Sequence, residues 1–514
     1  MRNRSVLLAR AGVVVFAAVL AAGTLPAQFT LTPDMKAALD RISANSLSGH
    51  VSFLASDTLA GRDTPSIGLD VAAEYIASQF RRAGLEPAGD DGYFETANYV
   101  SVKPNYDGFE FSVTVGGQTL RIPKEHVALP ATAAALDVPN AGVVKLPWAE
   151  IPQATAEQVN GKVLLSEMPG MSSLDEEGRR KFSESARAVS ETLARLKPAL
   201  AVLLVPRVRS GGGGMLREAS APGAGPAAPA SPWGIQVADA DLAKAYAEMK
   251  SGAADGTATF RCAAPVTEPV KLKNVIGVLR GSDPVLKDTY VLVTAHYDHL
   301  GVRPQGQGDR IYNGANDDAS GTATVVELAL ALGHLQQHPK RSIVFMTYFG
   351  EEKGGLGSQY YGRHPVFPIA KTVADMNLEQ LGRTDDSSGP EIGRASITGF
   401  DFSDVGATFE KAGELTGVTV FKDPQRSDAF FARSDNIYLA NLGIPAHTLC
   451  VAYVFPDYHQ PGDEWQKLDY PNMAKIDRMI GTGLLMIADN PVAPKWNAAN
   501  PKTEAYRKAA EERQ

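Results

Sequence analysis

The pattern that most constrains the fold of this chain is an alternation of apolar and helical segments after residue 270. The apolar segments read NVIGVL, YVLVTAHYD, SIVFMTYFG, TVADMNLEQ and IPAHTLCV, and they alternate with helical stretches such as GTATVVELALALGHLQQ. Strands that are apolar along their whole length are buried on both faces, because helices cover both sides of the sheet. The sequence therefore predicts a three-layer α/β/α sandwich with a mixed, largely parallel sheet.

The remaining segments are arranged around this α/β domain. Residues 31–100 carry two helical patterns separated by a turn-rich loop, and short alternating strands begin near residue 105. A Gly/Ala/Pro-rich stretch, 210–234, cannot pack a core and is typical of a surface loop. We predict an α/β domain made of residues 31–124 and 269–490, a β-rich insert at 125–268, and a peripheral tail at 491–514.

The first 27 residues have the composition of an export signal. Three arginines precede the apolar run GVVVFAAVLAAG, and small residues follow near Ala27. A retained membrane anchor is the alternative, but a spanning helix needs about 20 apolar residues and this run is shorter. We expect the signal peptide (residues 1–27) to be removed and the mature protein to be secreted or periplasmic, with no membrane partner.

Charge and cysteine content exclude some kinds of partner and site. The chain has 50 Lys and Arg against 58 Asp and Glu, a net charge of −8, and the predicted signal contains basic but no acidic residues. Because phosphate binding needs clustered basic side chains, this balance argues against nucleic acid. Cys262 and Cys450 fall in different predicted domains, so two buried thiols are favoured over a disulfide, and two cysteines alone cannot form a structural zinc site.

Histidine and acidic side chains follow several of the predicted strands, where ligands of open α/β sheets gather. In TAHYDHLG, His296 ends a strand and Asp298 comes two positions later, on the same side. Asp298 is thus placed to support the imidazole of His296, as carboxylates do for metal-bound histidines. Taken alone, an H-x-D sequence in a surface loop accounts for this segment as well.

Two further segments carry pairs of adjacent acids. In NGANDDASG, a Gly-flanked turn could aim Asp317 at a metal pair, whereas capping of the following helix by Asp317 or Asp318 is the alternative. In FMTYFGEEKGGLGS, Glu351 and Glu352 follow an apolar strand, where uncompensated charges are costly. One acid could bind a metal while the other takes a proton from water, or the two could form a solvated charge pair.

Glu379 and His459 complete the set. Glu379 follows the strand TVADMN, and His459 lies in the turn DYHQPGDEW, where a lone histidine is usually structural. Together the five segments supply imidazole and carboxylate groups at strand ends, which suits a pair of divalent ions. Zinc is the first choice for these ligands, and cobalt or manganese are also compatible.

These segments resemble the co-catalytic di-zinc peptidase family, which includes secreted leucine aminopeptidases, aminopeptidase Y and glutamate carboxypeptidase. The likeness rests on TAHYDHLG, NGANDDASG, GEEKGGLGS, NLEQLGR and YHQPGDE, in the family's order, and on LSGHVSFLASDTLAGRDTPSIG nearer the N-terminus. It extends over most of residues 40–480. The β-rich segment resembles the protease-associated domain that many members carry as an insert.

The resemblance implies a role for each of these residues. Asp317 would bridge two zinc ions, with His296 and Glu379 completing one site and Glu352 and His459 the other. Glu351 would be the general base that acts on a metal-bridging water, and Asp298 the partner of His296. Many relatives have Asp in place of Glu379, so we expect retained binding with altered metal affinity there. The family also implies a cis peptide bond after Asp317.

The resemblance implies a metalloexopeptidase, and an aminopeptidase that removes N-terminal residues from peptides is the favoured type. Asp428 and Asp435 are candidates for contact with the substrate amine and Tyr453 for a pocket wall, although salt bridges or core packing account for them equally well. A carboxypeptidase or dipeptidase of the glutamate carboxypeptidase type is an alternative, with Arg426 and Arg433 available for a carboxylate. A non-catalytic binding homologue is another alternative. Such proteins typically lose metal ligands, whereas every metal-ligand position of the family carries a suitable side chain here. The oligomeric state is not indicated by the sequence.

Overall fold

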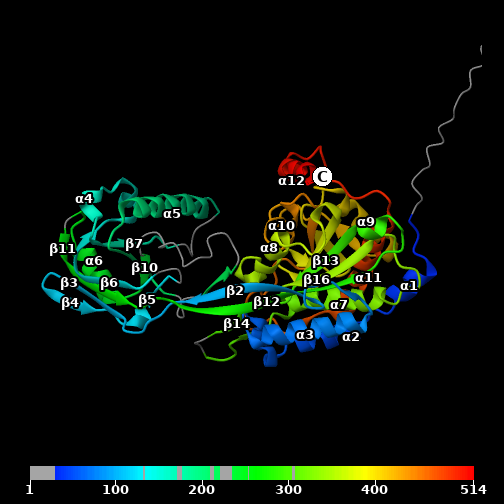
Figure 1. Cartoon of the computed structure of the whole chain (residues 1–514), viewed down its shortest axis with the longest axis horizontal. Coiled ribbons are helices and arrows are strands. Elements are labelled where there is room, and N and C mark those ends of the chain that lie inside the picture. Colours follow the sequence, from blue (N-terminus) through cyan, green and yellow to red (C-terminus); the bar gives the residue numbers. More distant parts are fainter. Residues whose placement is uncertain are drawn as a thin grey trace, which may run out of the picture.

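The computed structural model describes residues 29–130, 134–170, 176–208, 214–219, 234–252, 254–303 and 307–513. The predicted signal peptide lies outside these residues, as does most of 210–234. The chain forms two units, each with its own sheet and apolar core (Figure 1). Among the helices of the described ranges, none is long and apolar enough to cross a membrane.

The larger unit is built on a mixed sheet with a parallel centre. Four parallel neighbours form that centre: β22 (Ala446–Cys450), β17 (Thr372–Glu379), β13 (Tyr290–His296) and β16 (Ser342–Tyr348). Beyond β16 the sheet continues antiparallel through β12 (Val266–Leu279), β2 (Phe94–Lys103) and β9 (Met215–Glu218), and β1 (Glu86–Pro87) pairs with β12. Beyond β22 lie β20 (Arg394–Ile397) and β21 (Thr419–Phe421).

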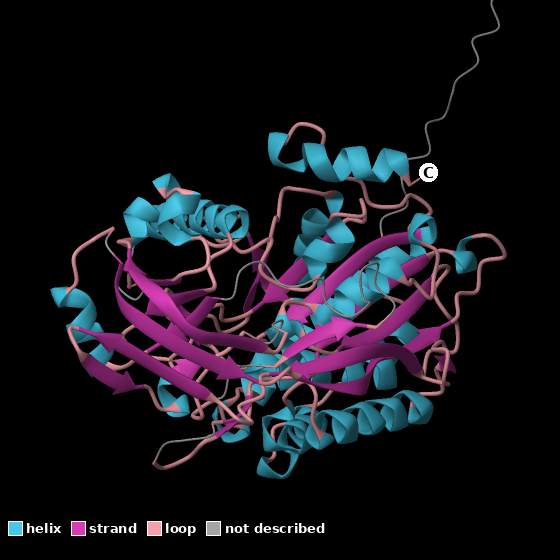
Figure 2. Cartoon of the chain, turned by 60° about the vertical axis from the view of Figure 1, so that its left-hand side comes forward, coloured by secondary structure: helices cyan, strands magenta, loops and turns pink. Residues whose placement is uncertain are grey.

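Helices cover both faces of this sheet, because side chains along its central strands alternate between two cores. Val291 and Val293 of β13 belong to one core, and Leu292 between them belongs to the other. The first core packs against α1 (Pro33–Leu39), α2 (Ala44–Leu54), α3 (Ile67–Arg82), α7 (Ser320–Leu332), α9 (Asp404–Thr416) and α11 (Tyr470–Asp489). The second packs against α8 (Leu356–Arg363), α10 (Asn436–Ala440) and α12 (Glu504–Glu512). The predicted three-layer α/β/α fold is confirmed (Figure 2).

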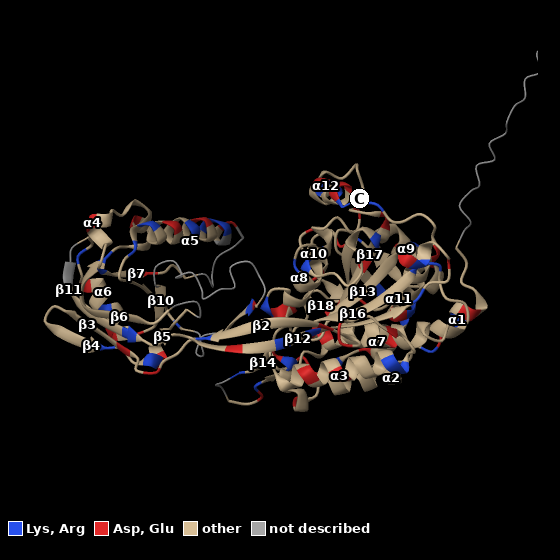
Figure 3. Ribbon diagram, in the orientation of Figure 1, with Lys and Arg blue, Asp and Glu red and all other residues tan. Residues whose placement is uncertain are grey.

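The smaller unit is β-rich, as predicted for the insert. Its sheet runs β4 (Gln118–Arg121), β3 (Glu110–Val115), β11 (Ala254–Cys262), β6 (Leu136–Lys145), β7 (Val163–Glu167), β8 (Leu200–Leu204), β10 (Gly234–Val237) and β5 (Val127–Ala128). Its helices are α4 (Ala156–Val159), α5 (Glu176–Leu196), which carries charges of both signs (Figure 3), and α6 (Ala240–Glu248). The sheet begins at β3, ahead of the boundary at residue 125 that the sequence suggested.

The two units are joined by strands. β2 and β12 pair over a long antiparallel register, from Phe94 opposite Val275 to Lys103 opposite Val266, and they run from one unit into the other (Figure 1). β9 lies within the stretch predicted as a surface loop, yet it pairs with β2 and so adds an edge to the larger sheet. The remaining strands form two small ribbons, β14 (Gly301–Val302) with β15 (Ile311–Tyr312) and β18 (Asp385–Asp386) with β19 (Gly389–Pro390).

The C-terminal residues, predicted as a peripheral tail, lie on the surface of the larger unit and are anchored to it by a few side chains. Trp496 is buried against the second core and stacks on Tyr506 of α12 with ring centroids 5.0 Å apart. Arg513 donates hydrogen bonds to Ile369 O and Thr372 O. The Pro, Asn and charged residues of this stretch obscured the two aromatic side chains that anchor it. Cys262 and Cys450 are both buried and unpaired, in separate sheets.

A buried histidine of β22 should make stability depend on pH. His447 Nδ1 lies 2.8 Å from Thr398 O and Nε2 lies 2.6 Å from Ser403 Oγ, and burial lowers the pKa of His447 from 6.5 to about 4. Between these two pH values the unfolded chain binds the proton more tightly, so folding stability rises with pH across this window, by up to about 3 kcal/mol.

We expect His447→Asn to keep the hydrogen bond to Thr398 O and to flatten the pH dependence of the unfolding free energy between about pH 4 and pH 6.5. Urea unfolding at several pH values in this window, for both proteins, measures the difference. An unchanged slope in the variant would assign the dependence to other groups.

Candidate metal centre

Chemically active side chains converge at the carboxyl end of the parallel strands. His296 ends β13 and Glu379 ends β17, while Glu351 and Glu352 follow β16 in a short turn. Asp317 lies in the turn before α7. Because β13 and β16 are buried along their whole length, the residues at their ends are held on a rigid support.

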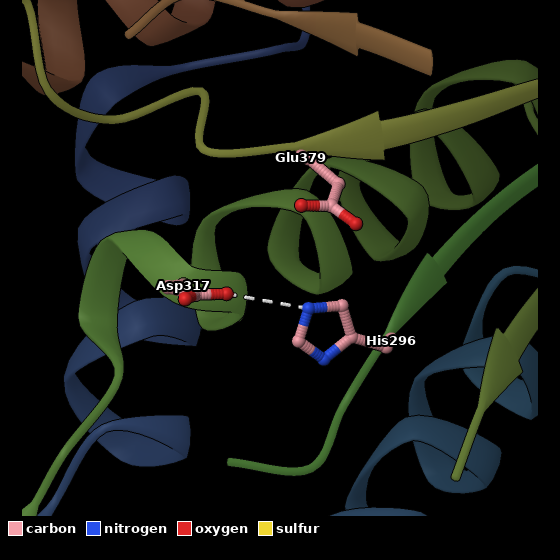
Figure 4. A group of neighbouring side chains, drawn as sticks. All are labelled: His296, Asp317 and Glu379. Carbon is pink, nitrogen blue, oxygen red and sulfur yellow. Dashed lines mark ion pairs between the residues drawn. The ribbon is translucent and has the colours of Figure 1, made fainter. Parts of the chain in front are cut away.

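Asp317 lies between two groups of potential ligands. Its Oδ1 is 3.3 Å from His296 Nε2, and its Oδ2 is 3.1 Å from His459 Nε2. His296, Asp317 and Glu379 face one another in Figure 4, with one ligand atom of each within 4.8 Å of the others. A second group of the same kind contains His299, Asp317 and Glu352. One carboxylate is therefore shared by two ligand sets.

His299 is a member of this site that the sequence reasoning missed. Its Nδ1 lies 2.9 Å from Glu352 Oε1, and its side chain is fully buried. His459 Nε2 approaches the same oxygen at 3.2 Å. The signal was the second histidine of HYDH, three residues after His296. In a continuing strand it would point to the opposite side, but the strand ends at His296 and the chain turns.

The electrostatics of Glu352 and His459 show that this place favours positive charge. Burial raises the pKa of Glu352, but contacts with His299 and His459 outweigh burial and lower it to about 2. Burial lowers the pKa of His459, but hydrogen bonds with Asp317 and Glu352 outweigh it and raise the pKa to about 10. The carboxylates thus stabilise positive charge on the imidazole, and a divalent cation would have to replace that proton. The nitrogen and oxygen donors of the cluster are those that zinc prefers.

Asp298 links His296 to Glu351. Its Oδ1 is 3.5 Å from His296 Nδ1 and accepts a hydrogen bond from Glu351 N at 3.0 Å. Its Oδ2 accepts a hydrogen bond from Thr64 Oγ1 at 3.2 Å. Burial, reinforced by the neighbouring carboxylates Glu379, Asp435 and Glu352, raises the pKa of Glu351 well above its ordinary value.

Glu379 and Asp317 are held in place by groups that the sequence did not single out. Ser434 Oγ donates to Glu379 Oε1, and Asn377 Nδ2 donates to Ser434 Oγ at 2.8 Å. Burial raises the pKa of Glu379 to about 7. Asp463 accepts hydrogen bonds from the backbone N–H groups of Asn316 and Asp317.

The turn that carries Asp317 requires a glycine. Gly314 has φ 57°, and a Cβ there would lie 2.3 Å from Asp317 O and 2.4 Å from His299 Cγ. The peptide bond between Asp317 and Asp318 is cis, as the resemblance implied.

The candidate substrate residues lie in different surroundings. Asp428 pairs with Lys502 at 2.6 Å and Lys422 at 3.2 Å, whereas Asp435 is buried and accepts a hydrogen bond from Ser358 Oγ. Tyr453 borders a cavity of about 190 Å³ next to Glu379. The cavity is lined by Glu379, Gln380, Thr398, Phe430, Arg433, Ser434, Thr448, Cys450, Tyr453, Val454 and Tyr458.

The two candidate arginines also differ. Arg426 Nη1 lies 2.5 Å from Asp386 Oδ1, so its charge is already paired. Arg433 borders the cavity, with its guanidinium 4.4 Å from the ring centroid of Phe430.

Comparison with known proteins finds a family match over part of this chain. Residues 274–483 match peptidase family M28. The resemblance predicted from the motifs is thereby confirmed, and the M28 match contains His296, Asp317, Glu351, Glu352, Glu379 and His459.

Curated proteins that are similar to parts of this chain carry the names of peptidases. A probable zinc metalloprotease of Pyrenophora teres f. teres (strain 0-1) is 39% identical over 118 residues, 23% of this chain and 24% of that protein. The probable glutamate carboxypeptidase VP8 of Zea mays is 25% identical over 248 residues, 44% of this chain and 32% of that protein. Aminopeptidase YwaD of Bacillus subtilis (strain 168) is 31% identical over 111 residues, 21% of this chain and 22% of that protein. The matches thus span 22–32% of the length of these relatives.

The fold has a solved counterpart. The aminopeptidase from Aneurinibacillus sp. strain AM-1 is similar with a TM-score of 0.57, over 90% of this chain and 97% of that one, at 19% identity. The similarity in fold therefore extends beyond residues 274–483 and covers most of the chain.

Proposed function

We propose that this chain is a secreted di-zinc metallopeptidase, an aminopeptidase that hydrolyses N-terminal residues from peptides. The observation that carries the proposal is the position of Asp317, whose two carboxylate oxygens face His296 and His459 separately. A single shared carboxylate between two sets of nitrogen and oxygen donors is the arrangement that a pair of ions needs.

Each ion would have ligands of its own. His296 and Glu379 would hold one ion and Glu352 and His459 the other, with Asp317 common to both and His299 beside the second set. Zinc fits these donors best, with cobalt or manganese as alternatives. When bound, such ions polarise a peptide carbonyl and lower the pKa of water at the site.

Glu351 is the proposed general base. It belongs to neither ligand set, and its backbone is fixed by the hydrogen bond to Asp298. Its carboxylate would accept the proton of the attacking water and return it to the leaving nitrogen. Burial raises the pKa of Glu351, which makes its carboxylate a stronger proton acceptor than an ordinary glutamate, and the protonated acid can then return the proton. Asp298 would hold His296 in its orientation.

The cavity beside Glu379 supports recognition of one terminal residue. Its volume of about 190 Å³ suits one side chain better than an extended peptide, and Phe430, Tyr453 and Tyr458 supply apolar walls. The similarity to a protein named aminopeptidase points the same way. The second candidate, a carboxypeptidase, is favoured by Arg433, which borders this cavity and could hold a carboxylate, and by a relative with that name.

Export and the insert belong to the same proposal. Secretion is inferred from the signal-like residues 1–27, and the β-rich unit is proposed to be a protease-associated domain on the likeness of its sequence. Peptides are the proposed partners.

The experiment that tests this function is hydrolysis of aminoacyl-4-nitroanilides beside N-blocked peptides and peptides with a C-terminal glutamate. Each is assayed before chelation, after chelation, and after zinc is added back. We expect turnover of free-amine substrates only, lost on chelation and restored by zinc. Release of C-terminal residues from blocked peptides would instead establish the carboxypeptidase. Absence of any turnover by a metal-loaded protein would refute both.

A further inference from the structure

Arg62 is brought to the metal centre from outside the M28 match by an unusual turn. Ala60, Gly61 and Arg62 all have left-handed backbone conformations, with φ of 47°, 69° and 48°. A Cβ on Gly61 would lie 2.5 Å from Tyr312 O and 2.6 Å from Gly301 O. Residues other than glycine rarely adopt this region, and here the conformation persists because the surroundings hold the turn.

The guanidinium of Arg62 is fully buried and joins two loops that carry ligands. Nε donates to Tyr297 O at 2.8 Å, and Tyr297 lies between His296 and Asp298. Nη1 donates to Asn313 O at 2.7 Å and to Leu54 O, and Nη2 donates to Gly314 O at 3.0 Å, shortly before Asp317. One planar group with fixed donor directions therefore sets the spacing between these loops.

The charge of Arg62 acts on the carboxylates of the site through space, because its guanidinium is hydrogen-bonded elsewhere. All its hydrogen bonds go to backbone carbonyls, while Asp298, Asp463, Asp318 and Asp317 act on it through space. Burial lowers the pKa of Arg62 to about 10, so it stays positive at neutral pH. A positive charge held in place by backbone carbonyls thus lies near a cluster of acids.

The residues beside Arg62 contact the same loop. His299 N donates to Arg62 O at 3.2 Å, and Thr64 Oγ1 donates to Asp298 Oδ2 at 3.2 Å. Asp63 pairs with Lys353, the neighbour of Glu352, at 2.8 Å. Every residue from Arg62 to Thr64 therefore contacts a segment of the metal centre.

We infer that Arg62 is a positioning residue of the metal centre, which fixes the His296–Asp298 loop against the Asp317 turn and so sets the affinity and geometry of metal binding. The inference rests on the proposed metal centre, and it is tested without peptide hydrolysis. The M28 match alone, residues 274–483, lacks this part of the site.

The test is cobalt binding by Arg62→Gln and Arg62→Lys in the full chain, measured by equilibrium dialysis and by the visible absorption spectrum at saturating cobalt. The matched control is Arg341→Gln. Arg341 is also buried and donates to backbone carbonyls, of Asn490 and Pro491, but it precedes β16 at the end opposite Glu351.

We expect Arg62→Gln to weaken cobalt binding by about 10- to 100-fold, the usual effect of removing a group that orients metal ligands, and to change the spectrum. Arg62→Lys should fall between wild type and Arg62→Gln, because an ammonium keeps the charge but not the fork of donors. Arg341→Gln should lower the unfolding temperature with wild-type affinity and spectrum.

Folded Arg62 variants with wild-type affinity and spectrum would overturn the inference. If Arg62→Gln does not fold, the same result for Arg62→Lys alone would overturn it, and so would an equal loss of affinity in Arg341→Gln. A wild type that binds cobalt but hydrolyses no peptide would refute the peptidase proposal, whereas the role of Arg62 would still be decided by the affinities.

Discussion

Glu351→Gln is expected to abolish most peptide hydrolysis and to leave metal binding intact. The amide cannot accept the proton of the attacking water, and a general base contributes about 100- to 10,000-fold to rate. The backbone N–H of residue 351 still donates to Asp298, and neither ligand set contains its side chain. Steady-state kinetics on a free-amine substrate, with metal content measured on the same sample, checks both parts.

A suitable control for this variant is Glu86→Gln. Glu86 of β1 is paired with Arg280, so its substitution also removes a carboxylate from the larger unit. We expect its kcat to remain at the wild-type level. Full activity in Glu351→Gln would remove Glu351 from the mechanism, and loss of metal in this variant would make it a ligand.

Asp317→Ala is expected to weaken the binding of both ions, in contrast to His459→Ala, which should weaken the binding of only one. Asp317 approaches histidines of both sets through different oxygens. Without it, each set loses an oxygen ligand, whereas the set of His296 and Glu379 is untouched when His459 is replaced.

Metal content after dialysis distinguishes the two variants. We expect hydrolysis to be undetectable in Asp317→Ala. If Asp317→Ala bound one ion as tightly as the wild type, Asp317 would be a ligand of a single site, and the proposal of a shared carboxylate would be wrong.

The parts of the fold that the sequence predicted are those buried on both faces. β13 and β16 are apolar along most of their length, and short apolar runs bounded by turns are typical of strands that helices cover on both sides. The first half of β12, from Val266 to Lys273, is largely exposed. Its sequence therefore shows no clear periodicity from which the long pairing with β2 could be predicted. β9 could not be predicted either, because a short edge strand depends on a partner far away in the sequence.

The residues of the candidate site also differ in whether the sequence could predict them. His296 and Glu379 end strands and Glu352 follows one closely, so local sequence and the general geometry of α/β sheets were enough to find them. Ser434, His299 and Arg62 act through contacts with the ligands or their loops, and these contacts exist only once distant segments have packed together. In the sequence, the whole of the smaller unit lies between Arg62 and His296, so no rule based on residue spacing connects them.

The pairing of β2 with β12 makes the smaller unit a removable module. Lys103 lies directly opposite Val266, so a tight turn of the kind that closes β-hairpins could join the chain there in place of more than a hundred residues. Such an excision would also delete β9, together with the ion pairs of Glu218 with Arg363 and His364. β2 would then become an unprotected sheet edge, open to pairing with another molecule. A shortened protein would therefore need a substitution on β2 that prevents such pairing, such as a lysine or a proline, to stay monodisperse.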